Sequence, residues 1–412
     1  MNLTLEFSMT MRAVSVSLFA TVTLAACGYD APSPEVLPWS ERDSAGVAVV
    51  QNRINELRAD RWSLDPAPLL SIGGMDAPES HQVFRVSGAV RLPDGRLAVS
   101  SAGTFDIRIY DGSGALLARW GSEGDGPEEF REPALMGRYG PDTLVVFDAR
   151  LSRISWVGAG SGVLGGVPIS WSGKGYPIGQ GLLPDGSILV GGGMSFSSDE
   201  GFPTGVIRPS STFGWVARDG TEGAHLGDFL AAEMFARADA RGFMARSLPF
   251  ARHTVAAAAP DGIWLGTADA WELRLYGFDG GVKRVVRGAR PPRPVTLSDR
   301  NAYVEAALGG TSTDNEARNL RALLDEMPFP AEYPPYQSLE VDAEGCLWVQ
   351  DYPAAEEEPA SWTVLDPSGR GVARVVTPAR TRVLEIGADY VLGVTTDALD
   401  VESVTLWRLH RS

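Results

Sequence analysis

The stretch Leu92-Pro93-Asp94-Gly95-Arg96-Leu97-Ala98-Val99 decides the fold, because its plan returns along the chain. A polar turn opens directly into a short apolar strand here and in five later copies. The copies are Pro141-Asp142 before Leu144–Val146, Pro184-Asp185-Gly186 before Ile188–Val190, Pro260-Asp261-Gly262 before Ile263–Leu265, Glu344-Gly345 before Leu347–Val349, and Gly387-Ala388-Asp389 before Val391-Leu392. Self-similarity of this kind predicts an array of repeated units.

The intervals between these turns indicate four-stranded units. Positions 94, 142 and 185 are 48 and 43 residues apart, and the last interval, from 344 to 389, is 45 residues. A propeller blade of four short strands needs about 40–50 residues. The intervals from 185 to 261 and from 261 to 344 are longer, so each is predicted to hold one blade and an insertion. Asp-Gly pairs such as Asp279-Gly280 supply the second hairpin turn of a unit.

The two ends of the chain are expected to meet in one sheet. The sixth unit has strands for only three positions before the chain ends. Leu69–Gly73 is similar to Leu116–Gly121, the outer strand of the first unit, and it precedes that unit. We therefore expect an all-β, six-bladed β-propeller of four-stranded blades, closed by an N-terminal strand, which leaves only short edges.

One run of motifs resembles a known family. Gly124–Phe130, Pro133 and Asp142 are followed by Val146-Phe147-Asp148 and Arg153-Ile154, and Gly345–Val349 repeats a Gly-x-Leu-Trp-Val strand. This order resembles the NHL-like six-bladed β-propellers of bacteria, over roughly residues 46–412. The resemblance implies a fold rather than an activity, because propellers host many functions.

The N-terminus predicts an exported, anchored protein. Met11-Arg12 precedes the apolar run Ala13–Leu24, which is too short to span a bilayer. Leu24-Ala25-Ala26-Cys27 resembles the bacterial lipobox, which implies lipidation of Cys27; the alternative is a chance cysteine in an ordinary signal. The expected domains are a signal peptide at 1–26, a Pro-rich tether at 27–45 and the propeller at 46–412. By the same resemblance, Gly28 favours the outer membrane.

Charge and cysteine usage narrow the partners. The formal net charge is −16, which argues against nucleic acid or an anionic membrane surface. We therefore expect the chain to attach to the membrane through its N-terminal lipid alone. We also expect a monomer. The one other cysteine, Cys346, lies inside an apolar strand and is expected to be a buried structural thiol.

The long insertions are expected on one face. They fall between second and third strands or between units, at Gly192–Ser211, Asp228–Arg252, Gly288–Gln337 and Asp351–Ser361. Long loops in compact domains commonly bind ligands, although loop length also drifts without function. In the largest insertion, about 288–337 between blades four and five, Ser298 is expected to cap a helix over 299–308. Thr313 with Glu316 is expected to cap a second helix.

Several side chains are candidates for that face. Each of four aspartates follows the apolar strand after the turn, so all four are expected near the channel rim: Asp148, Asp269, Asp351 and Asp397. Four converging carboxylates could bind Ca²⁺, although such an aspartate could instead cap its own loop. Phe105 and Trp271, which stand at loop ends, are expected to contact a ligand. His253 is expected on a channel-facing strand, as a further candidate for ligand binding.

Two function classes follow. The first is a lipid-anchored binding or scaffold module for a protein, peptide or glycan on the loop-rich face. The alternative is a metal-dependent hydrolase, lactonase or lyase, because six-bladed relatives include calcium lactonases and zinc or streptogramin lyases. A zinc site needs several histidines, and the chain has four, at 81, 225, 253 and 410. No complete catalytic triad stands out, so a binding role is favoured.

Overall fold

The computed structural model describes residues 38–57, 61–78, 81–194, 196, 202–239, 242–353, 355 and 358–411. Cys27, the signal peptide and the first part of the predicted tether lie outside these residues. Within the described part of the chain, no helix has the length and apolar character that a bilayer crossing requires.

Six sheets of the described residues share one antiparallel plan, and we number them in chain order. Sheet 1 holds β5 Val86–Arg91, β6 Leu97–Ser101, β7 Asp106–Tyr110 and β8 Leu116–Trp120. Sheet 2 holds β9 Pro133–Tyr139, β10 Thr143–Asp148, β11 Arg153–Gly158 and β12 Gly162–Pro168. Sheet 3 holds β13 Gly179–Leu182, β14 Ile188–Val190, β16 Ser210–Val216 and β17 Glu222–Leu230.

The later sheets take strands from the N-terminus as well. Sheet 4 holds β20 Val255–Ala259, β21 Gly262–Gly266, β22 Glu272–Tyr276 and β23 Val282–Gly288, extended by β2 Val47–Asn52 and β1 Trp39–Ser44. Sheet 5 holds β24 Ser338–Val341, β25 Leu347–Gln350, β26 Ala360–Leu365 and β27 Gly371–Thr377. Sheet 6 holds β28 Thr381–Ile386, β29 Tyr390–Thr396 and β30 Glu402–Arg411, with β3 Trp62–Leu64 and β4 Leu70–Gly73 paired to β30.

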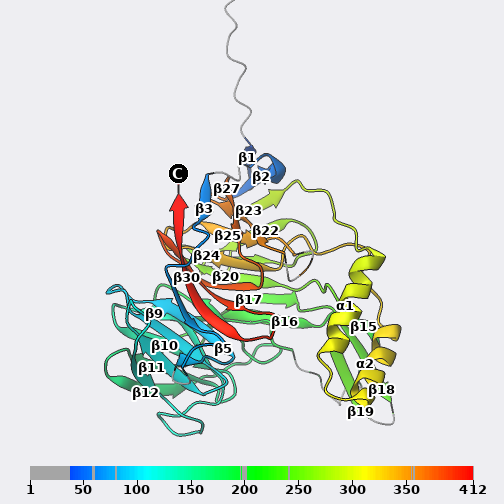
Figure 1. The fold of residues 1–412 in the computed structure, drawn as a ribbon. Coiled ribbons are helices and arrows are strands. Elements are labelled where there is room, and N and C mark those ends of the chain that lie inside the picture. Colours follow the sequence, from blue (N-terminus) through cyan, green and yellow to red (C-terminus); the bar gives the residue numbers. More distant parts are fainter. Residues whose placement is uncertain are drawn as a thin grey trace, which may run out of the picture. The chain divides into compact units, whose positions relative to one another are not determined.

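The first strand of each sheet contacts the first strand of the next sheet along the chain. β5 contacts β9, β9 contacts β13, and the series continues through β20, β24 and β28, which contacts β5 again. Four-stranded antiparallel sheets whose first strands follow each other in this way have the arrangement of a β-propeller (Figure 1).

Apolar second strands explain why the sheets pack face to face. β6 is buried along its whole length, because its alternate side chains meet different neighbours. Leu97 and Val99 share a core cluster with Leu392 and Val394 of sheet 6, whereas Ala98 belongs to a cluster with sheet 2. The strand is therefore apolar on consecutive residues, as the sequence predicts for a strand covered on both faces.

The described part of the chain begins inside the predicted tether. Trp39–Ser44 forms β1, and β2 pairs in parallel with β23. Asn52 is fully buried, and its side chain donates to Gly369 O at 2.9 Å and accepts from Gly371 N at 2.8 Å. The N-terminal hairpin is thus joined to sheet 4 by backbone pairing and to sheet 5 by the Asn52 amide and by the ion pair of Arg370 with Glu41, 2.7 Å apart. A short 3₁₀ helix, Ile54–Glu56, follows it.

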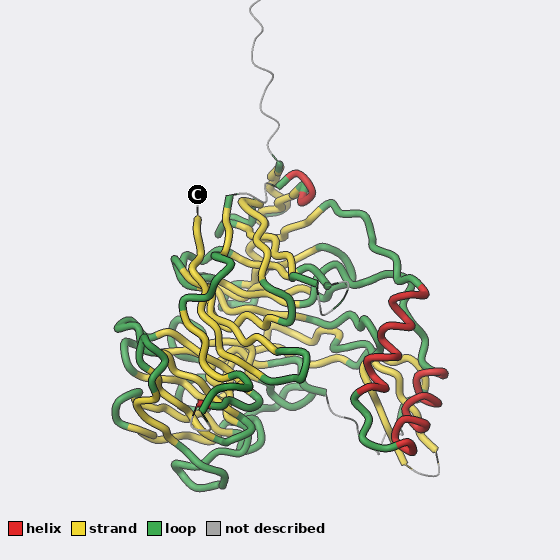
Figure 2. The backbone as a smooth tube through the Cα atoms, in the orientation of Figure 1, coloured by secondary structure: helices red, strands yellow, loops and turns green. Residues whose placement is uncertain are grey.

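Three insertions come together in one unit, which we call the helix–sheet module. Its elements are β15 Gly205–Ile207, β18 Met234–Asp239, β19 Gly242–Ser247, α1 Leu297–Gly309 and α2 Asp314–Glu326. β15, β18 and β19 form a separate three-stranded sheet, and the helices lie beside it (Figures 1 and 2).

Helix α2 packs within the module. Leu323, Leu324 and Met327 share a core with Phe235 of β18 and with Leu248, which follows β19. The first helix begins at Leu297 with Thr296 as its cap, in place of Ser298, because Thr296 and Asp299 form a reciprocal capping box. Thr313 caps α2 as predicted, accepting from Glu316 N.

Candidate functional site

Two of the four predicted rim aspartates hold their own loops. Asp148 is fully buried and accepts from the backbone N–H groups of Arg131, Glu132 and Leu151 at 2.8–3.1 Å. Asp397 is exposed and accepts from Leu399 N and Val401 N at 2.8 and 3.0 Å. Both carboxylates satisfy loop donors, which is the capping alternative that the sequence left open.

The third aspartate joins an insertion to sheet 4. Asp269 lies 2.5 Å from Arg208, which follows β15, and 3.5 Å from Arg252, which precedes β20. Arg252 also binds Glu233 at 2.5 Å. Burial acts to raise the pKa of the Glu233 carboxyl, but hydrogen bonds from Arg252 outweigh this effect and lower the pKa. Asp269 therefore lies between two guanidinium groups, at the base of the helix–sheet module.

The fourth aspartate makes an equivalent contact on sheet 5. The largely buried carboxylate of Asp351 lies 2.5 Å from Arg290, on the segment that leads into α1, and 2.9 Å from Arg374 of β27. Buried carboxylates held by arginine forks fix geometry strongly. Asp269 and Asp351 thus connect the segments that carry the module to the sheets beneath them.

These acids do not form a calcium site. Among the described residues, no three His, Cys, Asp or Glu side chains are grouped so that they could hold a metal ion. A Ca²⁺ ion takes six to eight oxygen ligands. The four aspartates occupy separate loops with their own partners, so their arrangement does not fit the ion, and we derive no reaction step through it.

The predicted aromatic contacts belong to the core. Trp271 is 6% exposed and meets Tyr336 edge to face, with ring centroids 6.3 Å apart. Phe105 packs against the cluster between sheets 1 and 2, with a left-handed backbone (φ 57°). His253 is half-buried just before β20, and burial lowers the pKa of its imidazole. Cys346 is buried as expected, and burial raises the pKa of its thiol to about 12.

Charged side chains on the first strands were not among the candidates from the sequence. Glu340 of β24 is partly exposed, and burial raises the pKa of its carboxyl to about 8, with Arg382 acting in the opposite direction. Arg382 of β28 donates to Val86 O of sheet 1. Glu385, also on β28, accepts from Arg91 N at 2.7 Å, and burial raises its pKa to about 7.

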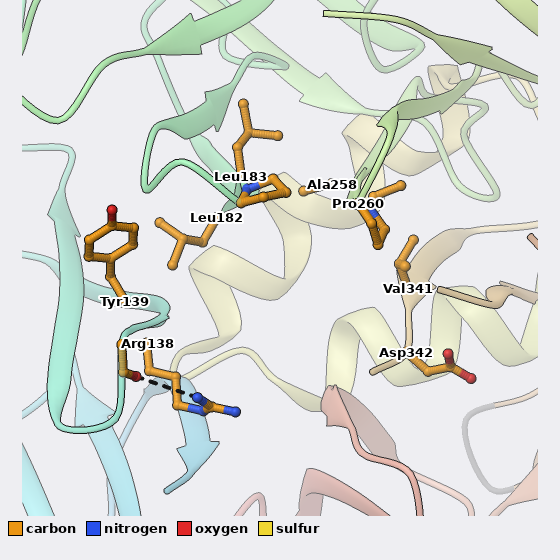
Figure 3. A pocket seen from close by; sticks show the side chains of 11 residues that line it. Arg138, Tyr139, Leu182, Leu183, Ala258, Pro260, Val341 and Asp342 are labelled. Carbon is orange, nitrogen blue, oxygen red and sulfur yellow. Dashed lines mark hydrogen bonds between the residues drawn. The ribbon is translucent and has the colours of Figure 1, made fainter. Parts of the chain in front are cut away.

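A pocket opens at the ends of the first strands that lead into the repeated turns, opposite the ends where the long insertions lie. It has a volume of about 330 Å³ and is lined by the turns that leave β9, β13, β20 and β24, so we call it the turn-face pocket. In Figure 3 the labelled side chains surround an open space, with Arg138 and Tyr139 on one side and Val341 and Asp342 on the other. The long insertions enter and leave at the opposite ends of these strands, because neighbouring strands are antiparallel.

One signal in the sequence could have found these residues. First strands pack between neighbouring sheets, so a charged residue at such a position is expected to have a partner or a function there. Arg91 stands just before a Pro-Asp-Gly turn, and Glu340 interrupts Ser338-Leu339-Glu340-Val341. Attention to charges within the repeated strands, rather than in the insertions, would have indicated this end of the sheets.

No family model and no curated protein matches the sequence. Similar solved structures include an exported protein from Bacteroides fragilis, at 11% identity over 88% of this chain and 99% of that chain, with a TM-score of 0.47. A DUF4221 family member from Bacteroides vulgatus is 12% identical over 86% and 100%, with a TM-score of 0.44. Virginiamycin B lyase from Staphylococcus aureus is 9% identical over 85% and 99%, with a TM-score of 0.39.

Proposed function

We propose that this protein is a lipid-anchored β-propeller of the cell envelope that binds a protein or peptide partner through its helix–sheet module. The observation that carries the proposal is the assembly of three separate insertions into one folded unit with its own core. Independent drift in loop length does not explain three insertions that complete one another. Long ordered insertions on a rigid scaffold are a common location for binding surfaces.

The contacts at the base of the module support a fixed binding surface. The ion pairs of Asp269 and Asp351 hold two of its connections. An aromatic cluster joins helix α1 to the loops of sheets 4 and 5, with ring centroids 4.7–6.3 Å apart; its members are Phe250, Tyr303, Phe329, Tyr333 and Tyr352. A surface held in place loses little entropy when a partner binds.

The exposed side chains of the module favour a protein partner. Val206 and Met244 are 56% and 37% exposed. They lie on the same face of the three-stranded sheet, because Val206 pairs with Phe235 and Met244 pairs with Arg237. Leu297 is 72% exposed at the start of α1. The same face of the sheet carries Phe235 and Arg237, which contact α2. Val206 and Met244 are therefore exposed apolar side chains beside the helices. Grouped exposed apolar side chains are typical of protein contacts.

The same proposal includes six blades, N-terminal closure and the anchor. The pairing of β4 with β30 and the series of contacts between first strands support six blades closed by the N-terminal segment. The lipobox-like stretch before Cys27 supports lipidation and export to the outer membrane. Substitution of Cys27 by serine should abolish fatty-acid incorporation and release folded protein from membranes.

Capture from envelope extracts tests the partner. The double variant Val206→Asp with Met244→Asp should lose the captured partner, because two charges then replace apolar contact surface. The matched control is Leu117→Asp with Leu164→Asp, which changes two side chains that are 56% and 59% exposed on β8 and β12. Equal capture by the module variant and the wild type, or equal loss in the control, would rule out the module as the binding surface.

A further inference from the structure

The turn-face pocket presents one cation and no free anion. Arg138 is exposed, and its only hydrogen bond within the described residues is a long one to Gly140 O, at 3.4 Å. No carboxylate of the described chain lies within ion-pair distance of it. Asp342 lines the pocket, but its carboxylate is buried and binds Arg411 at 3.0 Å and Trp348 Nε1 at 2.9 Å.

Apolar side chains form a second part of the lining. Leu182 and Leu183 come from the end of β13, Ala258 and Pro260 from the end of β20, and Val341 from β24. In Figure 3 these side chains stand around the open space across from the guanidinium group. A concavity that combines apolar side chains with one oriented charged group can hold a small molecule, and about 300 Å³ is enough for a small ligand.

We propose that the turn-face pocket binds a small organic anion, a carboxylate carried on an apolar body. The guanidinium of Arg138 would receive the carboxylate through paired N–H donors, and the leucine, proline and valine side chains would cover the body. This site lies at the other end of the first strands from the helix–sheet module, so it does not depend on the partner proposed above.

Glu385 adds a pH dependence. Glu385 accepts from Arg91 N and bonds to Tyr390, and the charges of Arg138 and Arg91 act on it. Burial nevertheless keeps the pKa of this carboxyl at about 7, so it ionises as the pH rises through neutrality. A second negative charge near Arg138 competes with a bound anion. Binding should therefore weaken above neutral pH, and Glu385→Gln should remove much of that loss.

The test uses the full chain and phenylbutanoate as the probe, with calorimetry as the readout. Phenylbutanamide, which has the same shape without the charge, is the matched ligand. We expect wild type to bind the acid in preference to the amide, and Arg138→Gln to weaken acid binding about tenfold or more, which is 1.4 kcal/mol or more. Arg150→Gln, an exposed arginine after β10 at the other end of the sheet, is the charge-matched control and should bind normally.

Two further variants keep the result interpretable. Arg138→Lys retains the charge and should keep part of the affinity even where Arg138→Gln is less stable. Leu182→Asn should weaken the acid and the amide alike, because it changes only the apolar wall. Undetectable binding of the acid to wild type, equal binding of acid and amide, or equal losses in the variants at 138 and 150 would each overturn the proposal.

Discussion

Four aspartates stand at the same place in four repeats, yet each has different partners. The repeat fixes where such a residue lies in its sheet, and the sequence predicts that much. Its partners come from loops that differ between units: backbone N–H groups around Asp148 and arginines from the insertions around Asp269 and Asp351. A pattern in the sequence therefore located these carboxylates but could not separate a metal ligand from a loop cap.

Burial should decide what each loop cap contributes to stability. Asp148→Ala leaves three partly buried N–H groups without their acceptor, so we expect it to lower the free energy of unfolding by about 2–3 kcal/mol. Asp397→Ala removes an exposed carboxylate whose donors can bond to water, so it should cost about 1 kcal/mol or less. Urea denaturation of both variants checks the order, and equal losses would contradict it.

Glu340 should make stability depend on pH. Its folded pKa of about 8 lies above the usual value of 4.5, so the folded chain keeps a proton that the unfolded chain releases between these pH values. The free energy of unfolding therefore falls as the pH rises through that window. In Glu340→Gln, the fall in the free energy of unfolding between about pH 5 and about pH 8 should be smaller than in wild type by roughly 2–4 kcal/mol.

Thermal or urea unfolding at several pH values measures this slope. Glu305→Gln on the exposed side of α1 is the matched control and should follow the wild-type curve in parallel. If the curve of the Glu340 variant also stays parallel to wild type, the carboxyl of Glu340 is already ionised at neutral pH. Water then reaches the first strands more readily than their packing indicates.

At the scale of elements, local signals were predicted well and assembly was not. The repeated turns located the strands, and Thr313 located the second helix, because hairpins and caps depend on residues a few positions apart. The module depends on contacts such as Val206 with Phe235, and Leu248 with Leu323. These residues belong to different insertions, and no local pattern states which insertions meet.

One buried side chain should contribute strongly to the attachment of the N-terminal hairpin. Asn52→Ala removes the buried amide that spans Gly369 O and Gly371 N, and it leaves both backbone groups without a partner. We expect a loss of about 2–3 kcal/mol in the free energy of unfolding. Gln51→Ala, the exposed neighbour on the same strand, should change stability little. If both variants unfold alike, the hairpin does not depend on this contact.

At the scale of the whole molecule, the turn-face pocket could not be predicted from the sequence. Long insertions are conspicuous in a sequence, whereas the turn-face pocket is built from short turns that look purely structural. Its walls come from Arg138, Leu182, Ala258 and Val341, which belong to four sheets spread over half of the chain. Only the circular arrangement of the sheets brings them together.

That arrangement depends on the joining of the two ends of the chain. β30 pairs with β4, and Ile72 packs in one core cluster with Leu392 and Val404. Ile72→Ala should therefore cost about 2–4 kcal/mol, whereas Ser71→Ala on the exposed side of the same strand should be nearly neutral. Truncation through residue 73 should cost more than truncation through residue 57, because only the longer one removes β3 and β4 and leaves one edge of β30 unpaired. Thermal midpoints that are equal for the two truncations would refute closure by the N-terminal segment, and the six sheets would then hold together without it.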